Sequence, residues 1–388
     1  MQSPSPDPLL VPLLSLGNFI IGMGAFVIIG LLEPLGADMG RSAAGAGLLL
    51  TVYSMAYAVL SPLLVAVTGQ IGRRRVLAAA LAVFALAAAL SALATNFTVL
   101  NIGRILAAAG AGIFTPVAAA VAAALYPEAQ RARVLAAVFF GLTLSQVLGV
   151  PVGSWIAYSF GWRWAFWLVL ALTLPCIWLT WTRVPAGLRF QPVSMKDLGA
   201  IIVQGRLMLA ILFTASFLGS IYVLYTYIAP LLSQTMGYGR DGITVMLLMF
   251  GMGAVVGNII GGVLADRLGW RRTLIILCLS QMLLMPVFSL LPFNPVLLAV
   301  FCVLWAAFGW AFMSGQQMRL IGLAGPQAPV VLALNAAAIY IGAAIGSAIG
   351  GLVIAGFGII AIGAAGGLAA AFALFHLLLS IRLSPAAS

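Results

Sequence analysis

The sequence predicts an all-α membrane protein with about twelve transmembrane helices in two pseudo-symmetric six-helix bundles. Of its 388 residues, 64% are hydrophobic and 6% are charged, whereas about 25% of the residues in a soluble domain are charged. The length accommodates about a dozen spans of ~20 residues with short connections. The chain also repeats itself: Gly72 and Arg74 recur as Gly269 and Arg271, an offset of 197 residues. Two similar halves in one hydrophobic chain are typical of transporters, whose site lies between the repeats.

The apolar stretches give each predicted span in order. In the first half the spans are expected at 9–32, 43–67, 76–95, 98–125, 134–159 and 164–182. In the second half they are expected at 206–232, 243–265, 273–291, 296–319, 329–356 and 359–381. These spans define six-helix bundles at 9–182 and 206–381. The polar stretch 183–205 predicts a cytoplasmic linker with a short interfacial helix. Residues 1–8 are expected to form a disordered tail without a signal peptide, and residues 382–388 are expected to form a C-terminal tail.

The net charge of +11 is a signal of topology. Thirteen basic residues fall in one set of loops or span ends, and only Arg41, Arg163 and Arg240 fall in the opposite set. The positive-inside rule therefore places both termini in the cytoplasm of a multi-pass protein, in a bacterial inner membrane. The bilayer and a small-molecule substrate are the expected partners. Nucleic acid is not expected, and the protein is expected to be a monomer.

The residues of common enzyme and metal sites do not form recognisable patterns. Cys176, Cys278 and Cys302 lie in apolar stretches and are predicted to be small buried hydrophobic residues, without a disulfide or a metal. His376 is the single histidine and is predicted to be an interfacial residue of the last helix, not a proton relay. No catalytic triad or phosphate loop is present, so we expect no enzyme and no cofactor. A proton gradient is the expected source of energy.

The stretch Gly262–Arg272 resembles the loop signature of the major facilitator superfamily. A carboxylate at a helix end can pair with a nearby arginine and latch a gate. Asp266 and Arg319 are both present in the second half, while the repeat places Gly69 and Ala122 at the matching positions of the first. We therefore predict an Asp266–Arg319 pair at the cytoplasmic gate; the alternative is that Asp266 caps a solvated loop. The other predicted gate residues are Arg267 and Arg272.

Arg104 lies inside the predicted fourth helix. An arginine within a span costs ~2.5–3.5 kcal/mol on insertion scales, so it is a candidate functional residue. It is expected to supply the charge of the cavity; the alternative is a side chain that reaches the outer surface. Relatives commonly carry a carboxylate in the middle of the first helix, where this chain has Gly24 and Ala25. Glu33, at the outer end of that helix, is the remaining coupling candidate, or else a solvated loop acid.

The string Leu148–Ser154 resembles the antiporter signature of the superfamily, a glycine-rich helix with a central proline that is associated with exporters. Pro151 removes a backbone hydrogen bond and bends the helix. Gly149 and Gly153 allow close packing and are expected to form a contact or sliding face. Ordinary helix packing is the alternative for these glycines.

The stretch Tyr225–Leu232, at the end of the predicted span 206–232, also looks like that of drug and sugar efflux members of the drug:proton antiporter family. The polar residues expected to line the cavity are Asn18, Tyr53, Gln146, Tyr225 and Asn335. The resemblance implies export of a small organic solute, such as a sugar, drug or metabolite, by alternating access with proton antiport. Since no carboxylate lies at depth to balance a cation, a neutral or anionic solute is favoured. The alternatives are an uncoupled facilitator or importer, and a membrane sensor or scaffold that does not transport.

Overall fold

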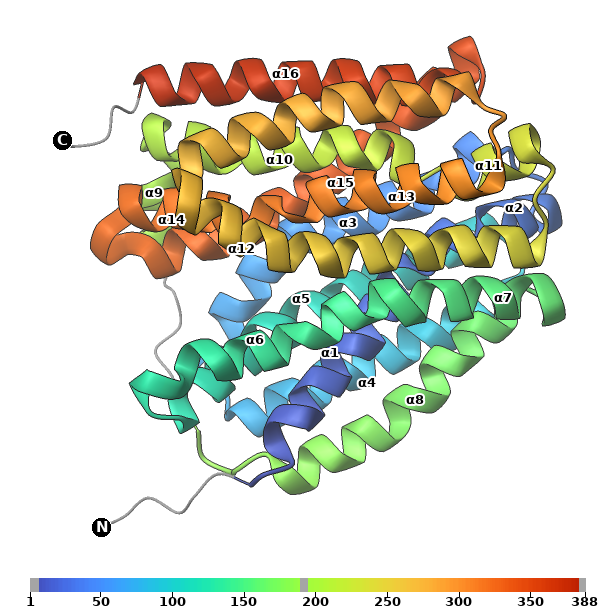
Figure 1. Ribbon diagram of the computed structural model, residues 1–388. Coiled ribbons are helices and arrows are strands. Elements are labelled where there is room, and N and C mark those ends of the chain that lie inside the picture. Colours follow the sequence, from blue (N-terminus) through green and yellow to red (C-terminus); the bar gives the residue numbers. More distant parts are fainter. Residues whose placement is uncertain (1–6, 189–194, 384–388) are drawn as a thin grey trace.

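The computed structural model describes residues 7–188 and 195–383, and these residues form helices and turns without a β-strand. Figure 1 shows two helical bundles, one above the other. The lower one, called the first bundle, contains α1 (Leu10–Phe26), α2 (Ile28–Asp38), α3 (Ala43–Val67), α4 (Arg73–Ala92), α5 (Phe97–Leu125), α6 (Glu128–Leu144), α7 (Val150–Phe160) and α8 (Trp162–Arg183).

The upper one, called the second bundle, follows the short linker helix α9 (Met195–Ile202). It contains α10 (Gly205–Tyr225), α11 (Ile228–Met236), α12 (Arg240–Leu284), α13 (Pro295–Trp310), α14 (Phe312–Ala324), α15 (Ala328–Phe357) and α16 (Ala361–Leu383). The linker thus holds a helix where the sequence predicts one, although residues 189–194 lie outside the described part of the chain. Most of both predicted tails, 1–6 and 384–388, also lies outside it.

Ten helical segments in the described ranges are long and apolar enough to cross a membrane. Two of them, Arg240–Leu290 and Pro295–Phe357, have 51 and 63 residues, at least twice the ~20 that one crossing needs. Each contains a glycine with positive φ, Gly269 at 75° and Gly325 at 52°, a conformation that favours glycine and lets the chain turn back. Dividing the two segments at these glycines is consistent with twelve crossings.

The first span is longer than the sequence predicts. The expected boundary at residue 32 is wrong, because the helix is interrupted at Val27 and then continues as α2 to Asp38. Pro34 lies inside α2 instead of ending it, and the neighbouring Leu32 and Leu35 are fully buried. Packing of these side chains outweighs the proline's local preference, so the carboxylate of Glu33 belongs to the helix.

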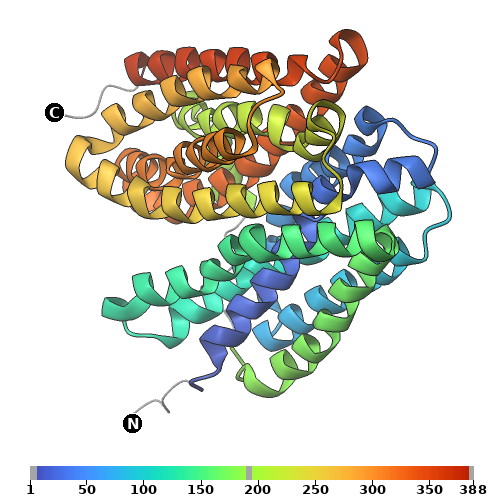
Figure 2. The same cartoon turned by 45° about the vertical axis from the view of Figure 1, so that its right-hand side comes forward.

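The two bundles meet at one end of the molecule and diverge toward the other. Both termini lie at the end where the ribbons diverge, which we call the terminal end; the opposite end is the far end (Figures 1 and 2). The largest contacts between bundles join α3 to α15, and α7 with the turn before it to α12. Within the described residues, the hydrogen bonds and ring contacts between bundles lie in the middle or at the far end.

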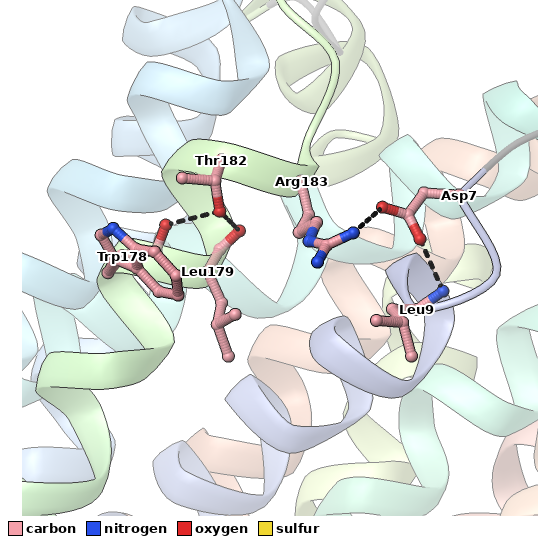
Figure 3. Close-up of polar contacts among 6 residues, drawn as sticks. All are labelled: Asp7, Leu9, Trp178, Leu179, Thr182 and Arg183. Atoms are coloured by element: carbon pink, nitrogen blue, oxygen red, sulfur yellow. Dashed lines mark hydrogen bonds and ion pairs between the residues drawn. The ribbon is translucent and has the colours of Figure 1, made fainter.

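A surface ion pair ties the start of the chain to the end of the first bundle (Figure 3). Asp7 accepts from the backbone N–H of Leu9 at 2.9 Å and from Arg183 Nη1 at 3.1 Å. These two donors, the amide first, hold the pKa of Asp7 below its ordinary value. Thr182, beside Arg183, donates its hydroxyl to the carbonyls of Trp178 and Leu179. An exposed pair of this kind is worth little stability, and it marks where the first bundle ends.

The close approach of α10 and α15 depends on glycines without side chains. A Cβ at Gly346 would collide with the backbone carbonyl of Gly219, whereas a Cβ at Gly356 of the same helix would meet nothing within 4 Å. We predict that Gly346→Ala lowers the free energy of unfolding by about 1–3 kcal/mol, because backbone atoms must move apart. Gly356→Ala should leave the free energy of unfolding unchanged or raise it slightly, because alanine has a higher helix propensity than glycine. Thermal unfolding in detergent compares the two; equal melting temperatures would contradict the packing.

Candidate site between and within the bundles

Arg104 of α5 caps the broken first helix. Its Nη1 donates to the carbonyl of Gly24 at 2.7 Å and its Nη2 to that of Ala25 at 2.6 Å. Both carbonyls belong to the last turn of α1, which ends one residue before Val27, and carbonyls in the last turn of a helix lack intrahelical donors. A cation is also favoured at a helix C-terminus. The guanidinium therefore satisfies backbone groups that lipid could not.

This placement corrects the expected role of Arg104. The side chain is 1% exposed, and the ring of Tyr53 covers its guanidinium, with 4.4 Å between Cζ and the ring centroid. Arg104 therefore faces the backbone of its own bundle and does not supply a free charge to a cavity in this structure, nor does it reach the surface. Tyr53, expected to line the cavity, is fully buried against Arg104.

The packing around Gly24 leaves little room for a larger side chain in the middle of the first helix. A Cβ at Gly24 would lie 2.7 Å from Phe84 Cζ and 3.2 Å from Val169 Cγ1, so a larger side chain does not fit without a shift. A small cavity of about 10 Å³ lies beside Gly24, Phe84 and Arg104. The acceptors that face Arg104 at this depth are therefore the backbone carbonyls of Gly24 and Ala25.

Aromatic rings fill the middle of the molecule where the bundles meet. The set, called the aromatic layer, consists of Phe26, Tyr53, Tyr57, Tyr222, Tyr225 and Tyr340. Tyr57 of α3 stacks on Tyr340 of α15 with a centroid separation of 3.6 Å. Phe26 of α1 stacks on Tyr222 of α10 at 6.3 Å. Sequence analysis found Tyr53 and Tyr225 as site candidates but missed Tyr340, which has no motif around it.

Gln146 and Tyr225 form the polar bridge of this layer. The Tyr225 hydroxyl donates to Gln146 Oε1 at 2.8 Å across the bundle boundary. Gln146 lies in a π-helical turn, Ser145–Gly149, directly before Pro151. Proline lacks the N–H that the carbonyl four residues earlier would bind, which favours a widened turn. The two polar candidates therefore meet, and the proline explains the local backbone.

The glycines of the antiporter-like string pack inside the first bundle. A Cβ at Gly149 would lie 3.0 Å from Met23 Cβ, and one at Gly153 would collide with Val27. These glycines therefore pack against Met23 of α1 and the adjoining Val27, within their own bundle. The surface that meets the other bundle is the π-turn, where Gly251 of α12 lies against the backbone of Val147.

Asn18 and Asn335, expected to line the cavity, are instead clamps within each bundle. Asn18 is fully buried; it donates to the carbonyl of Val138 at 2.9 Å and accepts from Thr115 at 2.9 Å. Asn335 accepts from Thr214 at 2.5 Å. Position 335 is the repeat equivalent of 138, so each bundle ties its first and fifth spans at matching sites. Buried amides with satisfied partners hold helices together and are not free for a solute.

Contacts at the far end join the bundles through Glu33. Its Oε2 accepts from the Tyr158 hydroxyl at 2.9 Å within the first bundle, and its Oε1 accepts from Ser233 Oγ at 2.7 Å in the second. Nearby, Ser347 Oγ of α15 donates to the carbonyl of Gly47 at 3.1 Å. Glu33 is therefore not a loop acid. The serine and tyrosine partners carry no sequence signal of their own.

The predicted Asp266–Arg319 pair is not formed in this structure. Within the described residues the ion pairs are Arg163–Asp38, Arg183–Asp7 and Arg240–Asp241. Arg319 is 2% exposed, donates to Ser380 Oγ at 2.5 Å and lies 5.3 Å from the Trp270 ring centroid, whereas Asp266 is exposed. Arg267 and Arg272 are exposed as well.

His376 packs inside the second bundle, against α10. The ring is 8% exposed; Nε2 donates to the carbonyl of Leu209 at 2.9 Å, which leaves Nδ1 to accept from Ser216 Oγ at 2.7 Å. Polar partners on α10 thus draw α16 onto the second bundle, and this was not visible from the leucine-rich sequence around the histidine.

The cap on α1 predicts a difference between two arginines. Arg104→Lys should lower the free energy of unfolding by about 1.5–3 kcal/mol, because a single ammonium group cannot reproduce the planar fork that reaches two carbonyls. Arg163→Lys, at an exposed ion pair of the same bundle, is the matched control and should change it by less than about 1 kcal/mol. Chemical or thermal unfolding measures both. Equal effects would show that the guanidinium does not cap the helix.

Comparisons with known proteins agree with this architecture. Residues 14–328 match the family model described as Major Facilitator Superfamily. The chain is 32% identical over 382 residues to the inner membrane transport protein YdhP of Escherichia coli (strain K12), and the match covers 97% of each chain. It is 29% identical to the uncharacterized MFS-type transporter YtbD of Bacillus subtilis (strain 168), and this match covers 92% of this chain and 91% of that one.

Solved structures share the fold at lower identity. A bacterial homolog of the human lysosomal transporter Spinster, in an inward-facing and occupied conformation, superposes with a TM-score of 0.75 at 17% identity over 96% of each chain. A D-xylose–proton symporter gives a TM-score of 0.72 at 18% identity, covering 94% of this chain and 96% of that one. With its two bundles, its repeat and these matches, the chain belongs to the Major Facilitator Superfamily of membrane transporters.

Proposed function

We propose that this transporter exports a small neutral organic solute from the cytoplasm by alternating access with proton antiport. The observation that carries the proposal is the distribution of contacts between bundles, which are concentrated in the middle and at the far end. This arrangement is expected of a state open at the terminal end, and the Spinster homolog with a similar fold is described as inward-facing. The positive-inside rule favours a cytoplasmic position for the terminal end, and the Escherichia coli relative is described as an inner membrane transport protein.

The chemistry of the middle favours a neutral solute. Apart from Glu33, which lies within α2, the acidic side chains of the described residues lie near the ends of helical spans or in the linker helix α9. Arg104 is engaged by carbonyls and by Tyr53. What remains for a solute is a set of ring faces and phenol groups, which favour a flat or sugar-like molecule that stacks and forms hydrogen bonds. A cation or an anion that entered the aromatic layer would find no free side chain of opposite charge there.

One rival has a specific observation in its favour. Because Gly24 and Ala25 present only carbonyls to Arg104, the first helix lacks a titratable group at mid-depth, and an uncoupled facilitator on the same fold would show this feature too. Reconstitution in liposomes with a trapped pH-sensitive dye separates the two. Antiport predicts that addition of a solute moves protons; solute flux without a proton signal would favour the facilitator. The absence of any flux across a panel of sugars, amphenicols and organic acids would favour a sensor or scaffold.

Stacking at Tyr340 gives a second test. Tyr340→Ala should weaken solute binding about tenfold, because a ring face in contact with the solute is lost. Tyr340→Phe keeps the ring and is the matched control, with at most a few-fold change. Binding is measured by calorimetry on the purified protein with the solute identified in liposomes. If both substitutions weaken binding equally, the hydroxyl and not the ring contacts the solute.

We infer that Asp266 and Arg319 pair when the terminal end closes. Arg319 supports this inference, since its Nε and Nη1 are buried without hydrogen-bond partners in the described chain. Asp266→Arg or Arg319→Asp alone should lower the rate of transport about tenfold, and the double exchange should recover part of it. A double variant no faster than the slower single one would contradict the pair.

A further inference from the structure

Glu33 occupies a position that no motif of the chain assigns. Its carboxylate lies between the bundles at the far end, with one oxygen bound to Tyr158 of α7 and the other to Ser233 of α11. Of these two hydrogen bonds, only the one from Ser233 crosses from the first bundle to the second. The bond from Tyr158 lies within the first bundle and orients the carboxylate toward Ser233. The side chain is neither fully buried nor fully exposed, so solvent at the far end can reach it.

The charged groups around Glu33 are engaged elsewhere. On its own helix, Asp38 binds Arg163 of α8 at 2.7 Å. Arg240 of α12 binds Asp241 at 2.7 Å and lies over the Trp155 ring.

The remaining neighbours give Glu33 no counter-charge either. Arg41, before α3, lies 5.2 Å from the Phe97 ring centroid, and α7 offers the Tyr158 hydroxyl. On α11, the polar groups at this end are the neutral Ser233, Gln234 and Thr235. Within the part of the chain that the structure describes, Glu33 has no ion pair, so its partners are two hydroxyl donors.

We propose that Glu33 is a proton-binding site that controls the far-end gate. The ionised carboxylate accepts both hydroxyls and holds α2 to α11; a proton taken up from the far side releases them. The proposal rests on the alternating access of the proposed function, but it requires neither a particular solute nor antiport.

Hydrogen-bond chemistry explains the direction of the effect. Hydrogen bonds to an ionised acceptor are roughly twice as strong as those between neutral groups. Protonation removes the charge from both bonds at once, and the new O–H is itself a donor that faces two hydroxyls. The closed far end therefore loses stability on acidification, and the equilibrium moves toward the state in which the bundles separate there.

Spin labels report the gate without any solute. One label is placed at Thr95→Cys, in the far-end turn before α5, and the other at Val296→Cys, near the start of α13; both positions are exposed. Their distance distribution is measured in lipid nanodiscs at roughly pH 7.5 and at roughly pH 4.5. The native cysteines are buried and are left in place.

The expected result is a longer distance at low pH in the otherwise wild-type protein. Glu33→Gln, which keeps the shape and removes the charge, should populate the longer distance about tenfold more at the higher pH and lose the pH response. Asp38→Asn, on the same helix but bound within its own bundle, should keep the response. If Glu33→Gln does not fold, Ser233→Ala should show the longer distance at the higher pH.

Three results would overturn the proposal. The first is a distance that does not change with pH in the otherwise wild-type protein, and the second is a pH response that survives in Glu33→Gln. The third, where Glu33→Gln does not fold, is an unchanged distance in Ser233→Ala. The proposed function fails separately, through absence of solute flux in liposomes, and that failure would leave the label distances unchanged.

Discussion

The structure depends on one constraint: every backbone polar group within the bilayer must find a partner inside the protein. The chain interrupts several of its spans, and each interruption frees carbonyls or amides that water would otherwise satisfy. At Val27 the partner is the guanidinium of Arg104. At the matching break of the second bundle, Thr226 donates its hydroxyl to the carbonyl of Tyr222. Before Pro151 the backbone widens into a π-turn.

These interruptions also shape the surface between the bundles. Phe26 and Tyr225 are the residues that end α1 and α10, and both belong to the aromatic layer. The π-turn places Gln146 against Tyr225 and exposes backbone to the close approach of Gly251. Irregular backbone therefore occurs where the bundles meet, which is where a transporter places its site. The far end adds hydrogen bonds between hydroxyl groups and a carboxylate. These bonds can be made and broken at little cost in free energy, because water can take the place of either partner.

The sequence predicted the architecture because hydropathy and the repeat report it directly. Helix ends were less predictable: the first span was expected to end at residue 32, where buried leucines continue the helix to Asp38. Gln146 and Tyr225 could be found as polar residues within apolar spans, although their contact could not.

The roles of the buried polar residues could not be read from the sequence. Arg104 was identified as unusual by its cost in a membrane, but only the fold shows that it faces carbonyls and not a cavity. Asn18 and Asn335 have the same appearance in the sequence as cavity residues, and the difference lies in partners more than a hundred positions away, Val138 and Thr214. The partners of Glu33 are equally distant, because packing between helices decides them.

The central claim is that the bundles separate at the far end during each transport cycle. A Cβ at Gly351 of α15 would lie 3.5 Å from the carbonyl oxygen of Ala44, at the start of α3, and 2.8 Å from the Tyr227 hydroxyl, which must shift to admit it. A short thiol-to-thiol cross-linker can therefore join Ala44→Cys to Gly351→Cys. The measurement is solute flux in liposomes before cross-linking, after it, and after cleavage of the linker. The account predicts that flux stops on cross-linking and returns on cleavage, while the uncross-linked double variant stays active. Full flux through the cross-linked protein would show that the far end need not open, and would contradict the account.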